Sequence, residues 1–152
     1  MIAARRGRRA PFGRGERGQA LVEFALVLPV MLLVILGLFE ASRAVWQVNT
    51  LAYAAREGTR YAIVHGSASD DPAWPGDTSG IVDAVRRAAV GVQNITVTAT
   101  WPDTIGGTPC YERNCRVAVD ATAPFVPLPS QFLLNGAFQI TLRGGSMLVI
   151  HR

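Results

Sequence analysis

The fold is decided by one stretch, Gly18-Gln19-Ala20-Leu21-Val22-Glu23-Phe24, together with the apolar run at residues 25–39 that follows it. Between residues 19 and 39 the only ionisable side chain is that of Glu23. A helix of this length extends about 31 Å at about 1.5 Å per residue, which is enough to cross a hydrocarbon core of about 30 Å. The stretch therefore predicts a transmembrane helix. Because a carboxylate is costly in a membrane, its presence marks Glu23 as a candidate functional residue.

Positive charge is concentrated in front of this run. The first 18 residues contain six arginines and one glutamate, a net charge of +5, whereas the rest of the 152-residue chain has a net charge of −1. A basic flank on one side of a span predicts a cytoplasmic N-terminus and an extracytoplasmic C-terminal part. We interpret this leader as a topology signal and not as an arm for nucleic acid or lipid headgroups. No nucleic-acid partner is expected, because the part that folds lacks a basic cluster.

The leader does not resemble an ordinary secretory signal. Residues 1–17 have little apolar periodicity, which predicts no regular structure there. A secretory signal has a shorter apolar core followed by an Ala-x-Ala-like cleavage site, and no such site follows Phe39. The leader is therefore expected to be cut before the apolar segment or not at all.

Pro29 lies inside the apolar run. A proline has no backbone N–H, so it leaves the carbonyl group of Ala25 without its helical partner. Neighbouring helices can compensate for this loss in a membrane. The sequence leaves two interpretations open: a functional weak point in the helix, or a simple bend.

The helical pattern continues beyond the span with a stripe of mostly small residues, here called the seam. Its members recur at alternating spacings of four and three, as in a coiled coil: Ala44, Val48, Leu51, Ala55, Gly58 and Ala62. Small residues allow close approach of a neighbouring helix. We expect the seam to pack on the chain's own sheet at its outer end and on other subunits near the membrane. Two i,i+3 ion pairs, Glu40 with Arg43 and Glu57 with Arg60, are expected on its polar side.

The remaining residues alternate between short elements. Gly66 is expected to end the first helix, and Ser79 to cap a second helix at residues 80–91. Strands are predicted at residues 94–101, 116–122, 138–143 and 146–150, with Gly144-Gly145 as a hairpin turn. A break is expected at 124–129 and a short helical turn at 130–134.

These elements predict an α+β fold. A long N-terminal transmembrane helix and a second short helix accompany a small antiparallel sheet, which packs on the outer half of the first helix. The expected organisation has four parts: a cytoplasmic basic leader at 1–18, a transmembrane segment at 19–40, an amphipathic continuation of the helix at 41–66, and an extracytoplasmic α+β domain at 67–152.

The two cysteines, Cys110 and Cys115, lie on the extracytoplasmic side of the predicted span. In such a compartment two cysteines so close in sequence predict a disulfide, whereas two free buried thiols are the alternative.

Motifs for catalysis and metal binding are absent from the sequence. His65 and His151 are far apart, and there is no Walker loop, Gly-x-Ser-x-Gly or His-Glu-x-x-His motif. The two cysteines lack the second pair that a zinc site needs. The adjacent carboxylates of Asp70-Asp71 are expected to be solvated. We therefore predict no enzymatic activity, no catalytic residues, no metal and no cofactor.

The opening stretch resembles the processing site of type IV prepilins. Gly18 is followed by four residues and then by Glu23-Phe24. The longer string VEFALVLPVMLLVILGLFEASRAVWQVNTLAYAAREGTRYA, residues 22–62, resembles the TadE-like proteins of the tight-adherence (Flp) pilus system. Pro29 and Ala55-Arg56-Glu57-Gly58 fall in the order that this resemblance expects. The resemblance covers less than a third of the chain, and the rest matches only in general layout.

The resemblance implies a pilin-like first helix and a role as a pseudopilin or minor subunit in pilus assembly. A prepilin peptidase would cut between Gly18 and Gln19, and Glu23, Phe24 and Pro29 would serve assembly; in type IV pilins the region around the proline can unwind in the filament. The implied partners are membrane lipid, the prepilin peptidase, other pilins or pseudopilins and the assembly platform. The implied location is a bacterial cytoplasmic membrane, crossed once, and incorporation into the pilus itself is left open.

The alternative is an unprocessed, signal-anchored extracytoplasmic binding protein that is unrelated to pili. It accounts for the topology and the disulfide, but it leaves Gly18, Glu23 and Pro29 unexplained. The mature N-terminus separates the two hypotheses. It would be Gln19 for a pilus subunit, and Met1 or Ile2 for a simple anchor.

Overall fold

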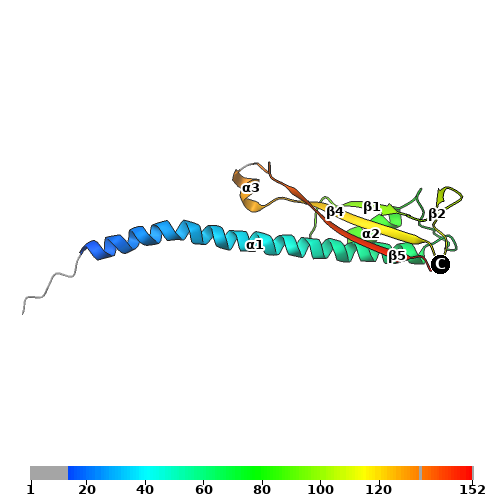
Figure 1. Cartoon of the computed structure of the whole chain (residues 1–152), viewed down its shortest axis with the longest axis horizontal. Helices are drawn as coiled ribbons and strands as arrows, with labels where there is room; N and C mark the ends of the chain where they lie inside the picture. Colours follow the sequence, from blue (N-terminus) through cyan, green and yellow to red (C-terminus); the bar gives the residue numbers. More distant parts are fainter. Residues whose placement is uncertain (1–13, 134, 152) are drawn as a thin grey trace, which may run out of the picture. The chain divides into compact units, whose positions relative to one another are not determined.

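The computed structural model of this chain describes residues 14–133 and 135–151 (Figure 1). The chain divides into two compact units, Met1–Phe39 and Glu40–Arg152, and the long helix α1 (Arg14–Val64) contributes to both. Residues 1–13 of the predicted leader lie outside the described residues. Residues 14–17 belong to α1, although the sequence predicted no regular structure there.

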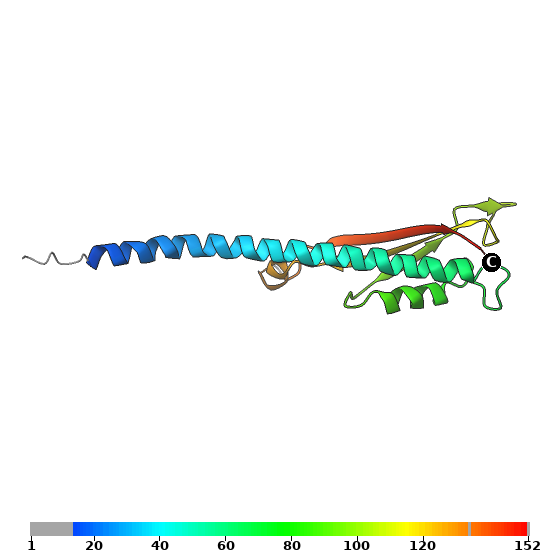
Figure 2. The same ribbon diagram turned by 90° about the horizontal axis from the view of Figure 1, so that it is seen from below.

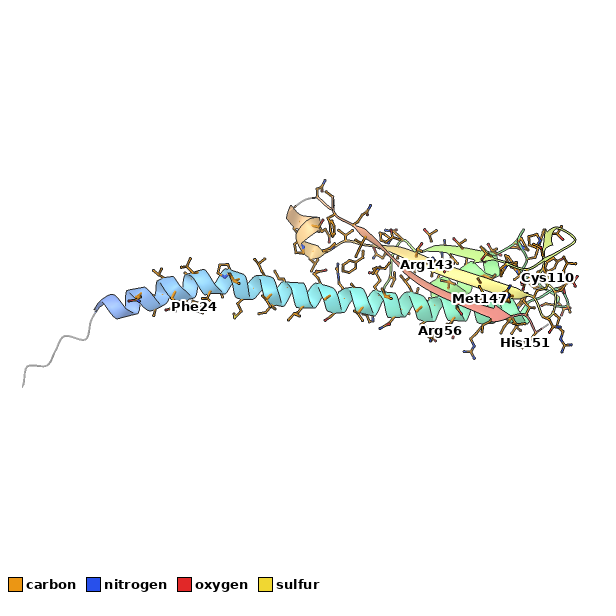
Figure 3. The ribbon with its side chains drawn as sticks, viewed as in Figure 1. Phe24, Arg56, Cys110, Arg143, Met147 and His151 are labelled. Carbon is orange, nitrogen blue, oxygen red and sulfur yellow. A yellow bond between two sulfur atoms is a disulfide. The ribbon has the colours of Figure 1, made fainter. Side chains whose placement is uncertain are left out.

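In the first unit, the part of α1 before Glu40 has its apolar side chains exposed. From Leu21 to Phe39 the large hydrophobic side chains are exposed, apart from the partly buried Leu28, and Figure 3 labels Phe24 among the exposed ones. Pro29 lies within the helix, which continues through it. Among the described residues α1 is the one helix that is long and apolar enough to cross a membrane, and none of its most apolar window is buried in the structure. This agrees with the predicted span.

The second unit combines the outer part of α1 with an α+β domain, as predicted. Three strands form an antiparallel sheet in the order β1-β4-β5, and two very short strands, β2 and β3, form a separate hairpin. The elements are α2 (Ser79–Ala88), β1 (Thr96–Thr100), β2 (Thr104–Ile105), β3 (Thr108–Pro109), β4 (Arg116–Phe125), α3 (Leu128–Leu133) and β5 (Ile140–Val149).

The core of this unit lies between one face of the sheet and two helices. Alternate residues of β4 are buried, because successive side chains of a strand point to opposite faces: Val117, Val119, Ala121, Ala123 and Phe125. The helices α1 and α2 cover this face, and Figure 2 shows them side by side. The packing is tight at Gly58, where an added Cβ atom would collide with Val85 of α2 and crowd Val119 of β4.

The seam behaves as the sequence predicted at its outer end. Leu51, Ala55, Gly58 and Ala62 are buried, whereas the two members nearest the span are only partly buried. Packing of the outer end on the chain's own sheet is confirmed. The predicted packing of the inner end on other subunits stays a prediction.

The prediction of a hairpin turn at Gly144-Gly145 was wrong. β5 runs through both glycines without a break and pairs them with Ala121 and Asp120 of β4. A tight hairpin turn needs a positive φ, and neither residue has one. Gly144 is instead buried against the backbone of α1, where an added Cβ atom would overlap the main chain of Leu51 and Ala52. This glycine permits close packing of a strand on a helix.

Replacing Gly144 with alanine should therefore destabilise the second unit. Neither the helix backbone nor the strand can yield locally, so we expect a loss of about 1–3 kcal/mol, as for overpacked cores. Thermal unfolding of the detergent-solubilised full chain, followed by circular dichroism, measures this loss. Gly145→Ala is the matched control, because its Cβ atom would meet only the movable carboxylate of Asp120. Equal unfolding midpoints for both variants would contradict the packing role.

Several other elements of the structure also differ from the predicted ones. Gly106 and Gly107 both have positive φ and form the turn of the β2–β3 hairpin, in a segment where no strand was predicted. β4 extends through Pro124, which the sequence placed in a break; this proline lies beyond the end of β1, where β4 has an open side. The predicted cap at Ser79 was wrong, because Ser79 is the first helical residue of α2 and the N-cap is Thr78, whose side chain makes no capping hydrogen bond. The Ser79 backbone N–H instead donates to Oδ1 of Asp77 at 2.9 Å.

Candidate functional site

The predicted cleavage site lies on the exposed surface of α1. Gly18 and Gln19 are both exposed within the helix, and no atom lies within 4 Å of the position that a Cβ atom on Gly18 would occupy. A glycine inside a helix costs about 1 kcal/mol relative to alanine. The described part of the chain therefore gives no packing reason for glycine at this position, and a requirement imposed from outside the fold accounts for it better.

The candidate assembly residues lie on the same stretch of helix. Glu23 is four residues beyond Gln19, so one helix face carries both side chains, and both are exposed. Among residues 18–132 and 135–151, whose side chains the structure describes, the Glu23 carboxylate has no hydrogen-bond or ion-pair partner. The side chains of Phe24 and Pro29 are exposed as well. This face can therefore accept groups from another chain without displacing any internal contact.

A set of contacts at the start of the second unit, here called the tether, was not predicted from the sequence. Glu40 forms the predicted ion pair with Arg43, at 3.1 Å, but it also accepts a hydrogen bond from the backbone N–H of Leu128 at 3.2 Å. The Arg43 guanidinium donates to the carbonyl oxygen of Val126 at 2.5 Å and lies 4.6 Å from the ring centroid of Phe125. The pair thus fixes the β4–α3 connection to α1. Its i,i+3 spacing predicted the pair itself, but no local signal pointed to its distant partners.

The disulfide predicted from the sequence is present. Cys110 and Cys115 are bonded to each other, with Cα atoms 5.9 Å apart, and the alternative of two free thiols is excluded. Cys110 directly follows the β2–β3 hairpin, and Figure 3 labels it at that end of the second unit. Asp103 strengthens the same region, because its carboxylate accepts hydrogen bonds from both the backbone and the guanidinium of Arg116. Those hydrogen bonds lower the pKa of Asp103 below its usual value.

Removing the disulfide should destabilise the second unit. Closing a loop of this length is worth about 2 kcal/mol in the loop-entropy model, so Cys110→Ser with Cys115→Ser should lower the free energy of unfolding by about that amount. Chemical denaturation of the full chain in detergent measures the change. A double variant as stable as the wild type would show that the bond does not constrain the unfolded chain.

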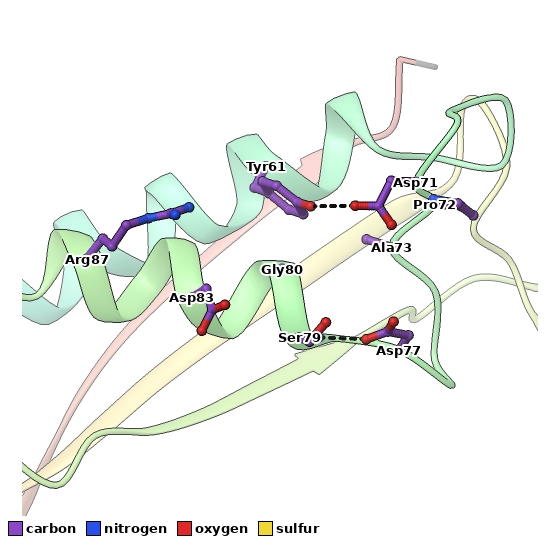
Figure 4. Close-up of a pocket in the computed structure, with 9 residues that line it drawn as sticks. All are labelled: Tyr61, Asp71, Pro72, Ala73, Asp77, Ser79, Gly80, Asp83 and Arg87. Carbon is purple, nitrogen blue, oxygen red and sulfur yellow. Dashed lines mark hydrogen bonds between the residues drawn. The ribbon is translucent and has the colours of Figure 1, made fainter.

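A hollow in the second unit gathers several carboxylates (Figure 4). It has a volume of about 380 Å³ and is formed by the end of α1, the following loop and α2; its polar lining includes Tyr61, Asp71, Asp77, Asp83 and Arg87. The Tyr61 hydroxyl donates to Asp71 at 3.4 Å; burial raises the pKa of Tyr61, and the adjacent carboxylate raises it further. Among the described residues no group of three or more His, Cys, Asp or Glu side chains is arranged to hold a metal ion.

Comparison with known proteins concerns the first helix. The family model described as TadE-like protein matches residues 18–60, which include the candidate cleavage site, Glu23, Phe24, Pro29 and most of the seam. The resemblance drawn from the sequence is thereby confirmed over this segment, which is less than a third of the chain. Neither a curated protein nor a solved structure matches the chain.

Proposed function

We propose that this chain is a TadE-like pseudopilin, or a minor subunit, that takes part in assembling a tight-adherence (Flp-type) pilus. The observation that carries the proposal is the match to the TadE-like family over residues 18–60. It is supported by an exposed glycine that the chain's own packing does not require, five residues before an exposed carboxylate that has no partner among the side chains described by the structure. The proposed role is structural and not enzymatic.

The proposed mechanism begins in the cytoplasmic membrane. The arginine-rich leader holds the precursor with its N-terminus in the cytoplasm. A prepilin peptidase cuts between Gly18 and Gln19 and creates a new α-amino group on Gln19. The second unit, with its disulfide, then lies outside the cytoplasm, where such bonds persist.

The new amino group gives Glu23 a partner. The carboxylate lies one helical turn from it and can pair with the amine of a neighbouring subunit or with its own. A buried ion pair offsets the desolvation of its two charges only when its geometry is good. The pair therefore sets the depth and register of one subunit against the next. The exposed apolar side chains of α1 contact lipid first and other pilins or the assembly platform later.

The N-terminus of the mature protein tests this proposal. We expect N-terminal sequencing of the membrane-bound protein from its own cells to begin at Gln19. A sequence beginning at Met1 or Ile2 would contradict the proposal and support an unprocessed, signal-anchored binding protein. Deletion of a prepilin peptidase gene is the control, since it should restore the longer form.

A further inference from the structure

The segment at residues 127–140, here called the α3 loop, exposes aromatic side chains without any charge nearby in sequence. Phe132 is 79% exposed and Phe138 is 57% exposed. No Asp, Glu, Lys, Arg or His occurs between residues 121 and 142. Exposed aromatic side chains in a segment without charged residues are typical of a contact with an apolar partner.

The α3 loop is held in one shape by Ser130. The side chain of this buried serine donates to the carbonyl oxygen of Phe138 at 2.9 Å and accepts from its backbone N–H at 3.0 Å. The backbone N–H of Gly136 also donates to the carbonyl oxygen of Ser130 at 2.9 Å. These hydrogen bonds close the loop on itself, while the side chains of Phe132 and Phe138 remain exposed.

The tether described above fixes the position of the α3 loop relative to Glu40 of α1. Glu40 accepts the hydrogen bond of Leu128, the second residue of the loop, and Glu40 directly follows the last residue of the apolar run. Figure 1 shows α3 at the opposite end of the sheet from strand β2. If the apolar run fills the hydrocarbon core, then the interface, about 5–7 Å deep on each side, begins at this residue. Because residues 39 and 40 are consecutive in the chain, the hydrogen bond to Glu40 keeps Leu128 close to the end of the apolar run.

We propose that the α3 loop is a second membrane contact, in which Phe132 and Phe138 enter the lipid interface beside the end of the transmembrane helix. Aromatic side chains favour the boundary between headgroups and acyl chains, and Phe is common on the apolar side of interfacial segments. The opposite end of the same unit differs, since it carries the charged residues Asp103, Glu112, Arg113 and Arg116. The contact would hold the sheet close to the membrane surface. This inference rests on the part of the proposed function in which α1 spans a bilayer.

Quenching by brominated lipid tests the contact in the full-length protein. The chain is reconstituted at low protein-to-lipid ratio in phosphatidylcholine vesicles whose acyl chains are brominated near the headgroup. The variants Phe132→Trp and Phe138→Trp each add one tryptophan, and their emission is compared with that of the wild type. Ile105→Trp is the matched control, because Ile105 is 57% exposed on the β2–β3 hairpin at the other end of the unit.

We expect the added tryptophan at 132 or 138 to emit at shorter wavelength and to lose emission in brominated vesicles, whereas that at 105 keeps its emission. Emission at both 132 and 138 equal to that at 105 would overturn the inference. Quenching or shielding that appears only as the protein-to-lipid ratio rises would also overturn it, since the loop would then contact another protein chain. Flotation of the wild type with the vesicles tests the membrane span separately. If the chain floats but the tryptophans added at 132 and 138 are not quenched, only the loop contact is refuted. If the chain does not float, both the membrane span and the loop contact are refuted.

Discussion

A chain with Gly18→Arg is expected to remain in the membrane as an uncut precursor. The peptidase must approach the backbone closely at the residue before the cut, and a side chain larger than that of glycine obstructs it. Among the described residues nothing lies within 4 Å of the Cβ position, so the first atom of the new side chain has open space. The added charge joins a leader that is already basic, so the topology is unchanged. The variant should therefore lose processing and not membrane insertion.

Immunoblotting of membrane fractions measures the outcome, since the precursor is longer by the 18 leader residues. A matched pair of variants separates obstruction of the peptidase from a general effect on the helix. Gly18→Val and Gly37→Val both add a branched side chain at a helical glycine that has open space around it. We expect Gly18→Val to accumulate as precursor and Gly37→Val to be processed normally. Normal processing of both Gly18 variants would exclude Gly18 as the residue that the peptidase reads.

The sequence predicted the first helix well because its signals are local and repeated. An apolar run of this length has few alternatives to a membrane span, and the seam repeats often enough to define a helix face. The structure buries that face from Leu51 outward, as expected. The disulfide was predictable for a similar reason, since two cysteines so close in sequence have little choice of partner.

The two Gly-Gly pairs show where such reasoning fails. Both Gly106-Gly107 and Gly144-Gly145 are compatible with a hairpin turn, and the sequence placed the turn at the second pair only. The structure has it at the first pair, where both residues have positive φ. Gly144 is needed instead because β5 crosses the backbone of α1, and this requirement comes from a residue more than eighty positions away. The spacing of residues along the sequence does not predict such a long-range contact.

The tether at Glu40 was missed for the same physical reason. An i,i+3 pair with Arg43 predicts an exposed interaction worth a few tenths of a kcal/mol. The structure adds Leu128 and Val126 as partners and leaves both charged side chains only partly exposed. Local periodicity therefore identified the pair, but its role in fixing the α3 loop follows only from the tertiary structure.

Glu23→Gln is expected to be processed and to remain in the membrane, yet to fail in pilus assembly. The substitution keeps the size of the side chain and removes its charge, so insertion becomes easier and not harder. Assembly would suffer because the new amine on Gln19 of a neighbouring subunit would be buried without its partner. Breaking a buried pair in this way costs about 3–5 kcal/mol, which corresponds to a loss of about a hundredfold or more in association. Electron microscopy of pili and surface adherence of a complemented deletion strain measure the loss.

Glu57→Gln is the matched control for this prediction. It removes a carboxylate from the same helix, but among the described residues Glu57 pairs only with the exposed Arg60, at 3.3 Å, and such surface pairs contribute little. We expect this control to assemble and adhere like the wild type. An immunoblot of the membrane fraction must show equal amounts of both processed variants, because only then does a difference in adherence report assembly. Wild-type adherence with Glu23→Gln would mean that the carboxylate has no role between subunits, and the exposed, unpaired Glu23 would need another explanation.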